Sequence, residues 1–388
     1  MKLLAKSAGQ LAPTYDAIVV GSGYGGGVAA SRLSRMGFGV AVMEQGRAWR
    51  PGDFPTTNKA RLKATYVNGM MPSMGDPTGL WRLTVGAGLS VFAATGLGGG
   101  SLINAGIALR PDLKRLRRAG WPEAVLCDGR FFEGLRRAER MLGPMPVPNP
   151  ERFAKYAAME RAAASAGTKL RLPSMTISHK SGRNTAGVMQ QACLHCGDCW
   201  SGCNTSAKTT VAITYITDAV DHGAKVFCET RVTSIAKVEV GWAVEVEDLS
   251  GSGERRQVTA KTLVLAAGTH GTNELLLRAQ RDGLALSKRL GENFSANGDD
   301  LVFANKLAQP ANAVASGHPS QAPLGMPPVG PHSMSMIDLG DEQGPAWVHD
   351  GAMLTVMARL APYKEALNLC FARAWRLLKG GVILKTLP

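Results

Sequence analysis

Acidic residues and targeting segments are both scarce in this sequence. Only 30 Asp and Glu residues stand against 44 Lys and Arg residues, which gives a formal net charge of +14. That charge favours attraction to an anion, such as a cofactor phosphate or an anionic membrane, without choosing between them. No zinc-finger spacing and no basic strand interleaved with aromatic residues accompanies it, so we expect no nucleic-acid partner. Residues 1–16 lack the apolar run of a signal peptide or a membrane span, so we expect a cytoplasmic protein.

The sequence also lacks the features of disordered, fibrous and disulfide-rich proteins. With 388 residues, of which 45% are hydrophobic, the chain is long enough for two packed domains. Its 46 glycines form short clusters without a fixed period, which indicates tight turns and close backbone approaches. Four of the seven cysteines lie within eleven residues, unlike the spread framework of a small secreted domain. We therefore expect a globular protein with reduced cysteines.

Near its start the sequence has the alternation of a βαβ unit. Residues 16–20, DAIVV, predict a buried strand, and residues 25–36 have helical spacing. Gly37 and Gly39 end this helix, and residues 40–43, VAVM, predict a second buried strand. The pattern predicts an α/β fold with a Rossmann-like FAD/NAD(P)-binding domain, which has three layers around a mostly parallel sheet.

The turn between the first strand and the helix carries residues that suit a dinucleotide. Gly21, Gly23 and Gly26 form G-x-G-x-x-G, and Glu44 follows the second strand. The first glycine permits a tight turn, the second lets backbone approach a pyrophosphate, and the third allows close helix packing. The helix N-terminus attracts the anion, and Glu44 would accept hydrogen bonds from ribose hydroxyls. These residues predict an adenine dinucleotide, which is either NAD or FAD.

Two later segments favour FAD over NAD. Residues 263–279, LVLAAGTHGTNELLLRA, predict a strand and helix that return beside the first strand and cover the cofactor. Residues 50–108 are rich in Gly, Pro and Met and are expected to form a cofactor-lining loop. Within them, GLGGGSLINAG at 96–106 would let backbone lie flat against a ring system, with Ser101 and Asn104 as polar contacts. The plainer alternatives are an ordinary strand-to-helix turn and a flexible glycine loop.

These segments, in this order, resemble the FAD-binding segments of the glucose-methanol-choline (GMC) oxidoreductases, and most closely their cholesterol oxidase-like branch. The resemblance covers most of 14–305 discontinuously and is carried by DAIVVGSGYGGGVAASRLSRMGFGVAVMEQGR, GGGSLINAGI, TRVTSIAKVEV and LVLAAGTHGTNELLLR. It implies that Gly21, Gly23, Gly26 and Glu44 contact pyrophosphate and ribose, that Gly100, Asn104 and Ile107 lie near the flavin, that Val232 contacts adenine through its backbone, and that Gly268 packs near the dinucleotide.

The resemblance also implies a reaction, namely hydride transfer to flavin from the CH–OH group of an apolar alcohol, for which a sterol is one candidate. Family members use a His, with a second His or an Asn, to handle the hydroxyl proton. None of the seven histidines lies in a recognisable version of that segment, so no catalytic residue is predicted. The alternative is a truncated, catalytically inert FAD-binding fragment or a subunit of a split enzyme. The oligomeric state is not predicted.

A cysteine cluster is the second specific pattern in the sequence. Cys193, Cys196, Cys199 and Cys203 have the C-x2-C-x2-C-x3-C spacing of bacterial ferredoxins, except that Asn204 replaces the usual Pro. Thiolates so spaced can surround an iron–sulfur cluster or a zinc ion. The pattern leaves three alternatives open: an iron–sulfur cluster, a zinc ion, or a thiol-rich, redox-active turn without metal.

The patterns together predict how the chain divides into domains. We expect a discontinuous FAD-binding domain over 14–110 and 205–300, a helical and loop insertion with the cysteines over 111–204, and an incomplete α+β substrate domain with a basic C-terminal segment over 301–388. Within that segment, residues 362–383 alternate apolar and basic side chains at helical spacing. This is typical of a helix lying on an anionic membrane or of a core helix without its cover.

Overall fold

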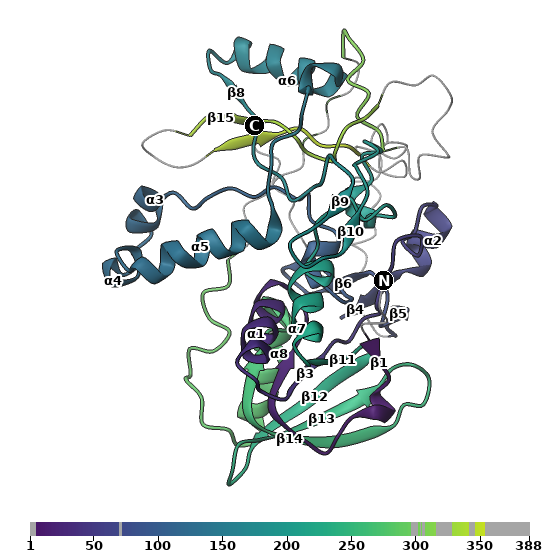
Figure 1. The fold of residues 1–388 in the computed structure, drawn as a ribbon, viewed down its shortest axis with the longest axis vertical. Helices are drawn as coiled ribbons and strands as arrows, with labels where there is room; N and C mark the ends of the chain where they lie inside the picture. Colours follow the sequence, from purple (N-terminus) through teal and green to yellow (C-terminus); the bar gives the residue numbers. More distant parts are fainter. Residues whose placement is uncertain are drawn as a thin grey trace.

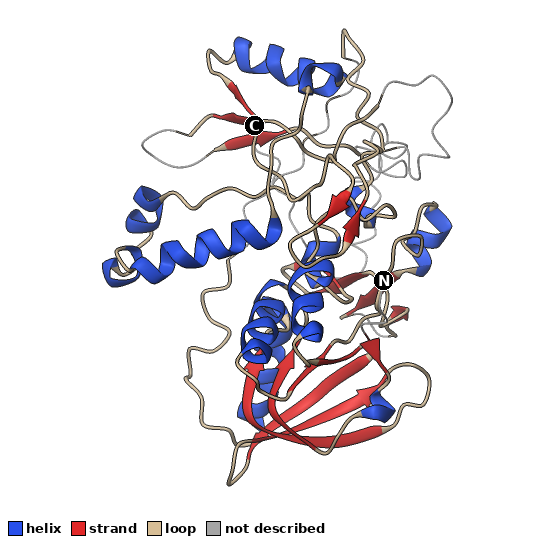
Figure 2. Cartoon of the chain, viewed as in Figure 1, coloured by secondary structure: helices blue, strands red, loops and turns tan. Residues whose placement is uncertain are grey.

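The molecule has a seven-stranded sheet at one end and smaller sheets and helices at the other (Figure 1, Figure 2). The structure is a computed structural model that describes residues 5–69, 72–295, 302, 304, 307–315, 328–340 and 346–353. The segment 362–383, for which a membrane-surface helix was one expectation, lies outside the described residues.

The seven-stranded sheet is mostly parallel, as predicted. Its strands are β1 (Ala5–Lys6), β2 (Thr14–Val20), β3 (Val40–Met43), β11 (Lys225–Phe227), β12 (Thr230–Lys237), β13 (Trp242–Asp248) and β14 (Arg255–Leu265). They lie in the order β1-β11-β3-β2-β14-β13-β12, in which the first five run parallel and β13 and β12 continue as an antiparallel hairpin. Val20 pairs with both Met43 and Leu265, so the carboxyl ends of the three central strands are level.

Helices cover both faces of this sheet. The α-helices of the described residues, both on this sheet and away from it, are α1 (Tyr24–Arg35), α2 (Asn58–Lys63), α3 (Leu113–Arg118), α4 (Glu123–Leu126), α5 (Gly129–Leu142), α6 (Ala154–Ser165), α7 (Thr217–Asp221) and α8 (Gly268–Arg281). Ala17 and Val19 of β2 pack under α1 and α7, whereas Ile18 and Val20 pack in the cluster that α8 completes. A strand buried on both faces must be apolar throughout, which explains the unbroken run AIVV.

Residues 50–108 contain a small sheet, which corrects the expectation of an irregular loop. Its strands are β4 (Thr65–Asn68), β5 (Met74–Gly75), β6 (Trp81–Val85) and β7 (Ser90–Ala94), in the order β5-β4-β6-β7. Most of their side chains are only half-buried, and the strands are two to five residues long. Such short strands between glycines show no clear alternation of apolar and polar residues, so the sequence conceals them.

A second core lies at the opposite end of the molecule. It joins α6 to a three-stranded sheet of β8 (Leu170–Arg171), β15 (Met336–Asp338) and β16 (Trp347–His349), near the two-stranded sheet of β9 (Gly182–Arg183) and β10 (Met189–Gln190) (Figure 1). Lys155 of α6 forms a buried ion pair of 2.8 Å with Asp350, which also accepts hydrogen bonds from the N–H groups of Met334 and Ser335. Packing and one buried charge pair therefore hold this region together.

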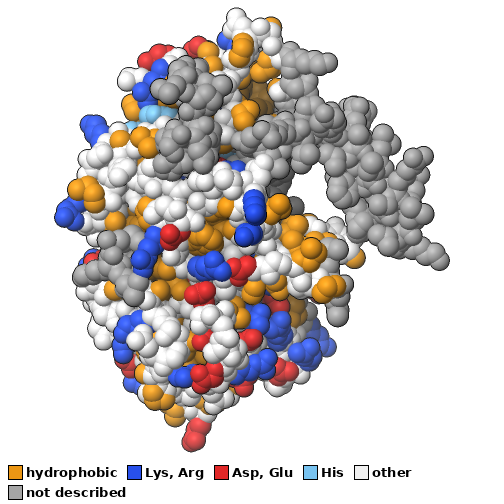
Figure 3. All heavy atoms as spheres, turned by 90° about the vertical axis from the view of Figure 1, so that its right-hand side faces the viewer, with side chains coloured by type: hydrophobic (Ala, Val, Ile, Leu, Met, Phe, Trp, Pro, Cys, Tyr) orange, Lys and Arg blue, Asp and Glu red, His pale blue; other side chains and the backbone are white. Residues whose placement is uncertain are grey.

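The surface mixes charges of both signs. On the face shown in Figure 3, basic and acidic side chains alternate with hydrophobic ones. Many arginines pair with carboxylates, including Arg110 with Glu139 and Arg231 with Glu247. None of the helices in the described residues has the length and hydrophobicity needed to cross a membrane.

Candidate functional site

Two glycines at the turn between β2 and α1, Gly21 and Gly26, cannot be replaced by another residue without a clash. Gly21 has a φ of 93°, and a Cβ atom there would lie 2.4 Å from the carbonyl oxygen of Ala266. A Cβ atom on Gly26 would lie 2.0 Å from the carbonyl oxygen of Gly21. The turn therefore packs directly on the turn between β14 and α8, which brings Gly268, the first residue of α8, next to it.

The glycine loop, defined here as residues 96–107, meets this turn from another side. A Cβ atom on Gly99 would lie 2.7 Å from the Cα atom of Gly23, so the two backbones are in direct contact. Gly100 is exposed, and a Cβ atom there would meet nothing within 4 Å. The structure thus brings Gly23 and Gly100, both predicted as cofactor contacts, to one place with open space beside them.

Glu44 connects the two glycine segments through a buried carboxylate. Its Oε2 accepts hydrogen bonds from the hydroxyl of Ser22 at 2.5 Å and from the N–H of Ser22 at 3.1 Å. Its Oε1 accepts from the N–H groups of Gly46 at 2.9 Å and Gly96 at 3.3 Å. Burial raises the pKa of Glu44, and these four hydrogen bonds oppose that effect. A ribose hydroxyl could reach this carboxylate by replacing the Ser22 hydroxyl as a donor.

Asn104 lies beside the N-terminus of α1. Its N–H donates to the carbonyl oxygen of Gly100 at 3.0 Å, and its Nδ2 donates to the hydroxyl of Tyr24 at 3.0 Å. The Oδ1 atom of Asn104 is buried and accepts no hydrogen bond from the described residues. A buried acceptor without a donor is costly unless a ligand supplies one. The residues present here therefore fit a bound group that carries N–H or O–H donors.

The two remaining predicted contacts lie in different surroundings. Val232 is buried in the cluster with Met43, and the N–H of Thr230 in the same strand donates to the carbonyl oxygen of Glu44 at 2.9 Å. This places β12 next to the predicted ribose site. Ile107 instead forms a β-bridge with Met175 and packs against the second core. The side chain of Ile107 is therefore shared between the glycine loop and the second core.

Three residues that we did not single out from the sequence belong to this site. Ser22 and Tyr24 occupy variable positions of G-x-G-x-x-G, so the motif gives no signal for them. Lys208 is fully buried, and its ammonium donates to the carbonyl oxygens of Leu102 and Asn104 in the glycine loop. Burial lowers the pKa of Lys208 to about 8, so it stays mostly protonated at neutral pH. Nothing in its sequence context marks Lys208 as special.

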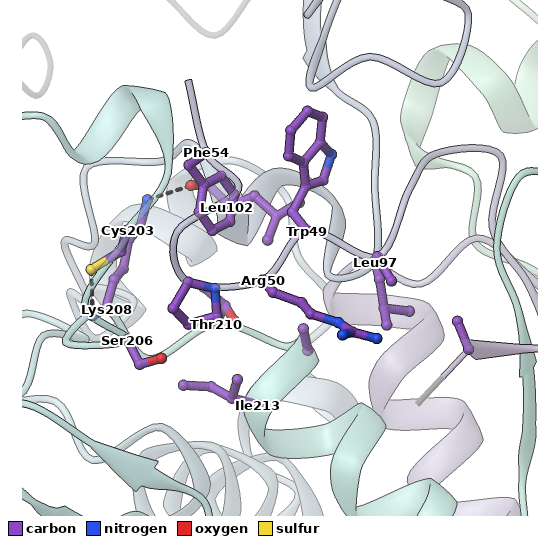
Figure 4. A pocket seen from close by; sticks show the side chains of 14 residues that line it. Trp49, Arg50, Phe54, Leu97, Leu102, Cys203, Ser206, Lys208, Thr210 and Ile213 are labelled. Carbon is purple, nitrogen blue, oxygen red and sulfur yellow. Dashed lines mark hydrogen bonds between the residues drawn. The ribbon is translucent and has the colours of Figure 1, made fainter. Parts of the chain in front are cut away.

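An apolar cavity of about 70 Å³ lies beside the glycine loop (Figure 4). Leu97 and Leu102 of the loop form one side, and Trp49 and Phe54 line it with their rings stacked at 5.8 Å between centroids. Lys208 completes the lining, and Figure 4 shows its hydrogen bonds to Leu102 and Cys203. The cavity thus separates the glycine loop from the segment that follows the cysteines.

The cysteine loop, residues 193–203, surrounds a smaller cavity of about 40 Å³ that all four predicted ligands line. Three of the sulfur atoms accept a backbone N–H at 3.4 Å, from His195 to Cys193, from His332 to Cys199 and from Lys208 to Cys203. Burial, together with the neighbouring thiols, raises the pKa of Cys196 to about 12. All cysteines in the described residues are free thiols.

The structure does not support the expected iron–sulfur cluster or zinc ion at Cys193, Cys196, Cys199 and Cys203. The described residues contain no group of three or more His, Cys, Asp or Glu side chains that could hold a metal ion. Metal binding requires thiolates, whereas burial raises the pKa of the Cys193 and Cys196 thiols. Correct sequence spacing alone is therefore not enough to establish a metal site here.

Comparison with known proteins gives a consistent family. The sequence model described as GMC oxidoreductase matches residues 15–297. A cholesterol oxidase of Mycobacterium tuberculosis (strain ATCC 25618 / H37Rv) is 32% identical over 76% of this chain and 53% of its own length. A cholesterol oxidase of Acinetobacter baumannii is 27% identical over 78% of this chain and 58% of its own. The chain therefore spans about half the length of these curated relatives.

More distant similarities include a plant protein and a solved structure. A long-chain-alcohol oxidase of Arabidopsis thaliana is 25% identical over 62% of this chain and 28% of its own length. A fungal aryl-alcohol oxidase structure aligns with a TM-score of 0.46 at 16% identity, over 69% of this chain and 48% of that one.

Proposed function

This chain belongs to the GMC oxidoreductase family, and from that premise we propose that it binds FAD and forms the cofactor-binding part of an enzyme that oxidises an apolar alcohol. One observation carries the proposal. The β2–α1 turn contacts two segments that are far apart from it in the sequence, namely the β14–α8 turn at Gly21 and the glycine loop at Gly23. A site for a long dinucleotide requires such a meeting of the motif with distant segments.

Different residues of the site would contact different parts of FAD. The N-terminus of α1, whose N-cap residue is Gly23, would attract the pyrophosphate. Glu44 would accept ribose hydroxyls, and the backbone of β12 at Val232 would lie against adenine. Asn104 would use its unpaired Oδ1 to accept a hydrogen bond from the flavin. FAD would supply the hydride acceptor of the reaction.

The substrate class is inferred from the names of the relatives. Cholesterol oxidases and long-chain-alcohol oxidases both act, by name, on alcohols with a large apolar body. We therefore propose the CH–OH group of an apolar alcohol as the reacting group, with a sterol as the more specific candidate.

An absorbance spectrum of the purified chain tests the first step, because bound flavin gives bands that a flavin-free protein lacks. The anaerobic addition of a sterol or a long-chain alcohol then tests the second, since hydride transfer bleaches those bands. Bands that fade would support an alcohol-oxidising enzyme. Bands that persist with every alcohol would instead support an FAD-binding part that needs another segment for catalysis. A protein that takes up no FAD would overturn the proposal.

A further inference from the structure

We propose that Lys208 is a positioning residue for the flavin, because it fixes the glycine loop against the cysteine loop and thereby sets the place of Asn104. The inference rests on the proposed FAD binding and goes beyond it. It gives a function to a buried lysine that lies outside the dinucleotide motif, and it connects the cysteine loop to the cofactor site.

The hydrogen bonds of Lys208 join two segments that are about a hundred residues apart. Its Nζ donates to the carbonyl oxygens of Leu102 at 3.0 Å, Asn104 at 2.5 Å and Cys199 at 3.0 Å. An ammonium has three donors, so all of them are used. Two of these hydrogen bonds go to the glycine loop and one goes to the cysteine loop. The ammonium of Lys208 therefore joins the two loops directly.

The burial of this charge makes the connection stiff. Lys208 is 2% exposed, and none of the groups in the described residues that shift its pKa is a carboxylate. A buried charge without a counter-ion is costly to leave unsolvated, so the ammonium depends on its three carbonyl acceptors. If one carbonyl moved away, the ammonium would lose one of its three acceptors. The three carbonyls are therefore held at fixed positions.

Asn104 transmits this position to the cofactor site. Its backbone carbonyl accepts from Lys208, while its side-chain amide donates to the hydroxyl of Tyr24 at the start of α1. The Oδ1 atom of the same amide is the buried acceptor proposed to face the flavin. A shift of the Asn104 backbone would therefore move that acceptor relative to the dinucleotide turn.

The second core offers a matched control for the loss of a buried lysine. Lys155 is also 2% exposed, and its Nζ donates to the carbonyl oxygens of Pro331 and His332. It differs in having Asp350 as a counter-ion, and its partners Asp350, Pro331 and His332 lie outside the glycine loop. The variant Lys155→Met therefore removes a buried ammonium without touching the glycine loop.

The test compares Lys208→Met, Lys208→Gln and Lys155→Met in the full chain loaded with FAD. The readouts are the FAD dissociation constant, the flavin absorbance spectrum and the flavin midpoint potential. We expect Lys208→Met to weaken FAD binding about tenfold and to shift both the spectrum and the potential. Lys208→Gln replaces the ammonium by an amide that still carries N–H donors, so it should shift the spectrum and the potential less. Lys155→Met should lower the melting temperature and leave the flavin properties of the folded protein unchanged.

A surface variant keeps the test informative if Lys208→Met does not fold. Tyr24→Phe removes only the hydroxyl that holds the Asn104 amide, so it should reproduce part of the spectral shift. The proposal is overturned if Lys208→Gln and Tyr24→Phe both leave the flavin spectrum and potential as in the unchanged protein. It is also overturned if Lys155→Met shifts them as much as Lys208→Met. If the unchanged chain binds no FAD, the proposed function itself fails, which is a distinct outcome.

Discussion

The dinucleotide turn and the cysteine loop both carry a specific sequence pattern, but only the first dictates its own structure. At Gly21 and Gly26 an added Cβ atom would lie 2.0–2.4 Å from a backbone carbonyl oxygen, so the spacing of the glycines is a consequence of backbone contact. At the cysteine loop the spacing only permits a metal, and burial raises the pKa of the Cys193 and Cys196 thiols. Glycine patterns therefore report on the chain itself, whereas ligand patterns also depend on a partner.

The substitution Gly26→Ala is the most direct way to break the first half of this comparison. The new methyl group would lie 2.0 Å from the Gly21 carbonyl oxygen, which belongs to a turn already packed on β14. We expect a loss of about 4 kcal/mol or more in the free energy of unfolding and the loss of FAD binding. Denaturant unfolding followed by circular dichroism measures the first effect, and FAD titration measures the second.

Gly134→Ala is the control, since Gly134 lies in the middle of α5 and an added Cβ atom meets nothing within 4 Å. Alanine favours a helix over glycine by about 1 kcal/mol, so this variant should be as stable as the parent or more so. If the two substitutions had similar effects, steric contact at the turn would not be the reason for its glycines.

The sequence predicts best the regions whose pattern is enforced by backbone contact and by burial. The strand 40–43 is found where it was expected, and the strand and helix around Gly21 begin one or two residues earlier than predicted. Long apolar runs and obligatory glycines leave few alternatives to such elements. The short strands β4 to β7 could not be predicted, because their half-buried side chains show no alternation.

Tertiary contacts explain what else the sequence conceals. The role proposed for Lys208 follows from its hydrogen bonds to Leu102 and Asn104, which are about a hundred residues away in the sequence. Neither composition nor local spacing carries information about such a contact. The iron–sulfur expectation was not supported for a related reason, because spacing does not reveal the surroundings that raise the pKa of the Cys193 and Cys199 thiols.

A buried ion pair stabilises the second core, whereas close backbone contact fixes the dinucleotide turn. The substitution Asp350→Ala tests the contribution of that ion pair. The substitution leaves the buried Lys155 ammonium without its counter-ion and two backbone N–H groups without an acceptor. We expect a loss of about 3 kcal/mol in the free energy of unfolding, measured by denaturant titration. Lys261→Met, which breaks the exposed pair with Asp16, should have no measurable effect. Equal losses would show that burial of the pair does not matter.

Glu44 gives the dinucleotide region a pH dependence that the glycines cannot give. Because burial raises its pKa in the folded protein, the folded state holds this proton at pH values where the unfolded state has released it. The stability of the FAD-free protein should therefore fall as the pH rises from the ordinary pKa of Glu44 to its raised value. Ribose hydroxyls favour the carboxylate, so FAD affinity should rise over the same range.

The variant Glu44→Gln separates these two effects, since the amide has a similar shape and does not titrate. It should flatten both pH profiles and weaken FAD binding about tenfold at neutral pH. Thermal unfolding and FAD titration, each measured across pH, give the two profiles. An unchanged pH dependence of FAD affinity in this variant would remove Glu44 from the ribose site.

The smallest expected effect concerns the cysteine loop and tests whether its thiols behave as the structure describes them. Alkylation by iodoacetamide requires the thiolate, and burial raises the pKa of Cys196 to about 12, so this residue should react slowly at neutral pH. Cys127 is exposed and serves as the internal reference for a fast reaction. Peptide mass spectrometry over a time course, with and without a metal chelator, measures both rates.

A chelator that speeds alkylation of Cys196 would show that a metal had protected the loop, and the contrast between the two patterns would then disappear. With no such change, the cysteine loop contributes packing and the Cys199 carbonyl that Lys208 binds, while the glycine turn alone enforces its geometry.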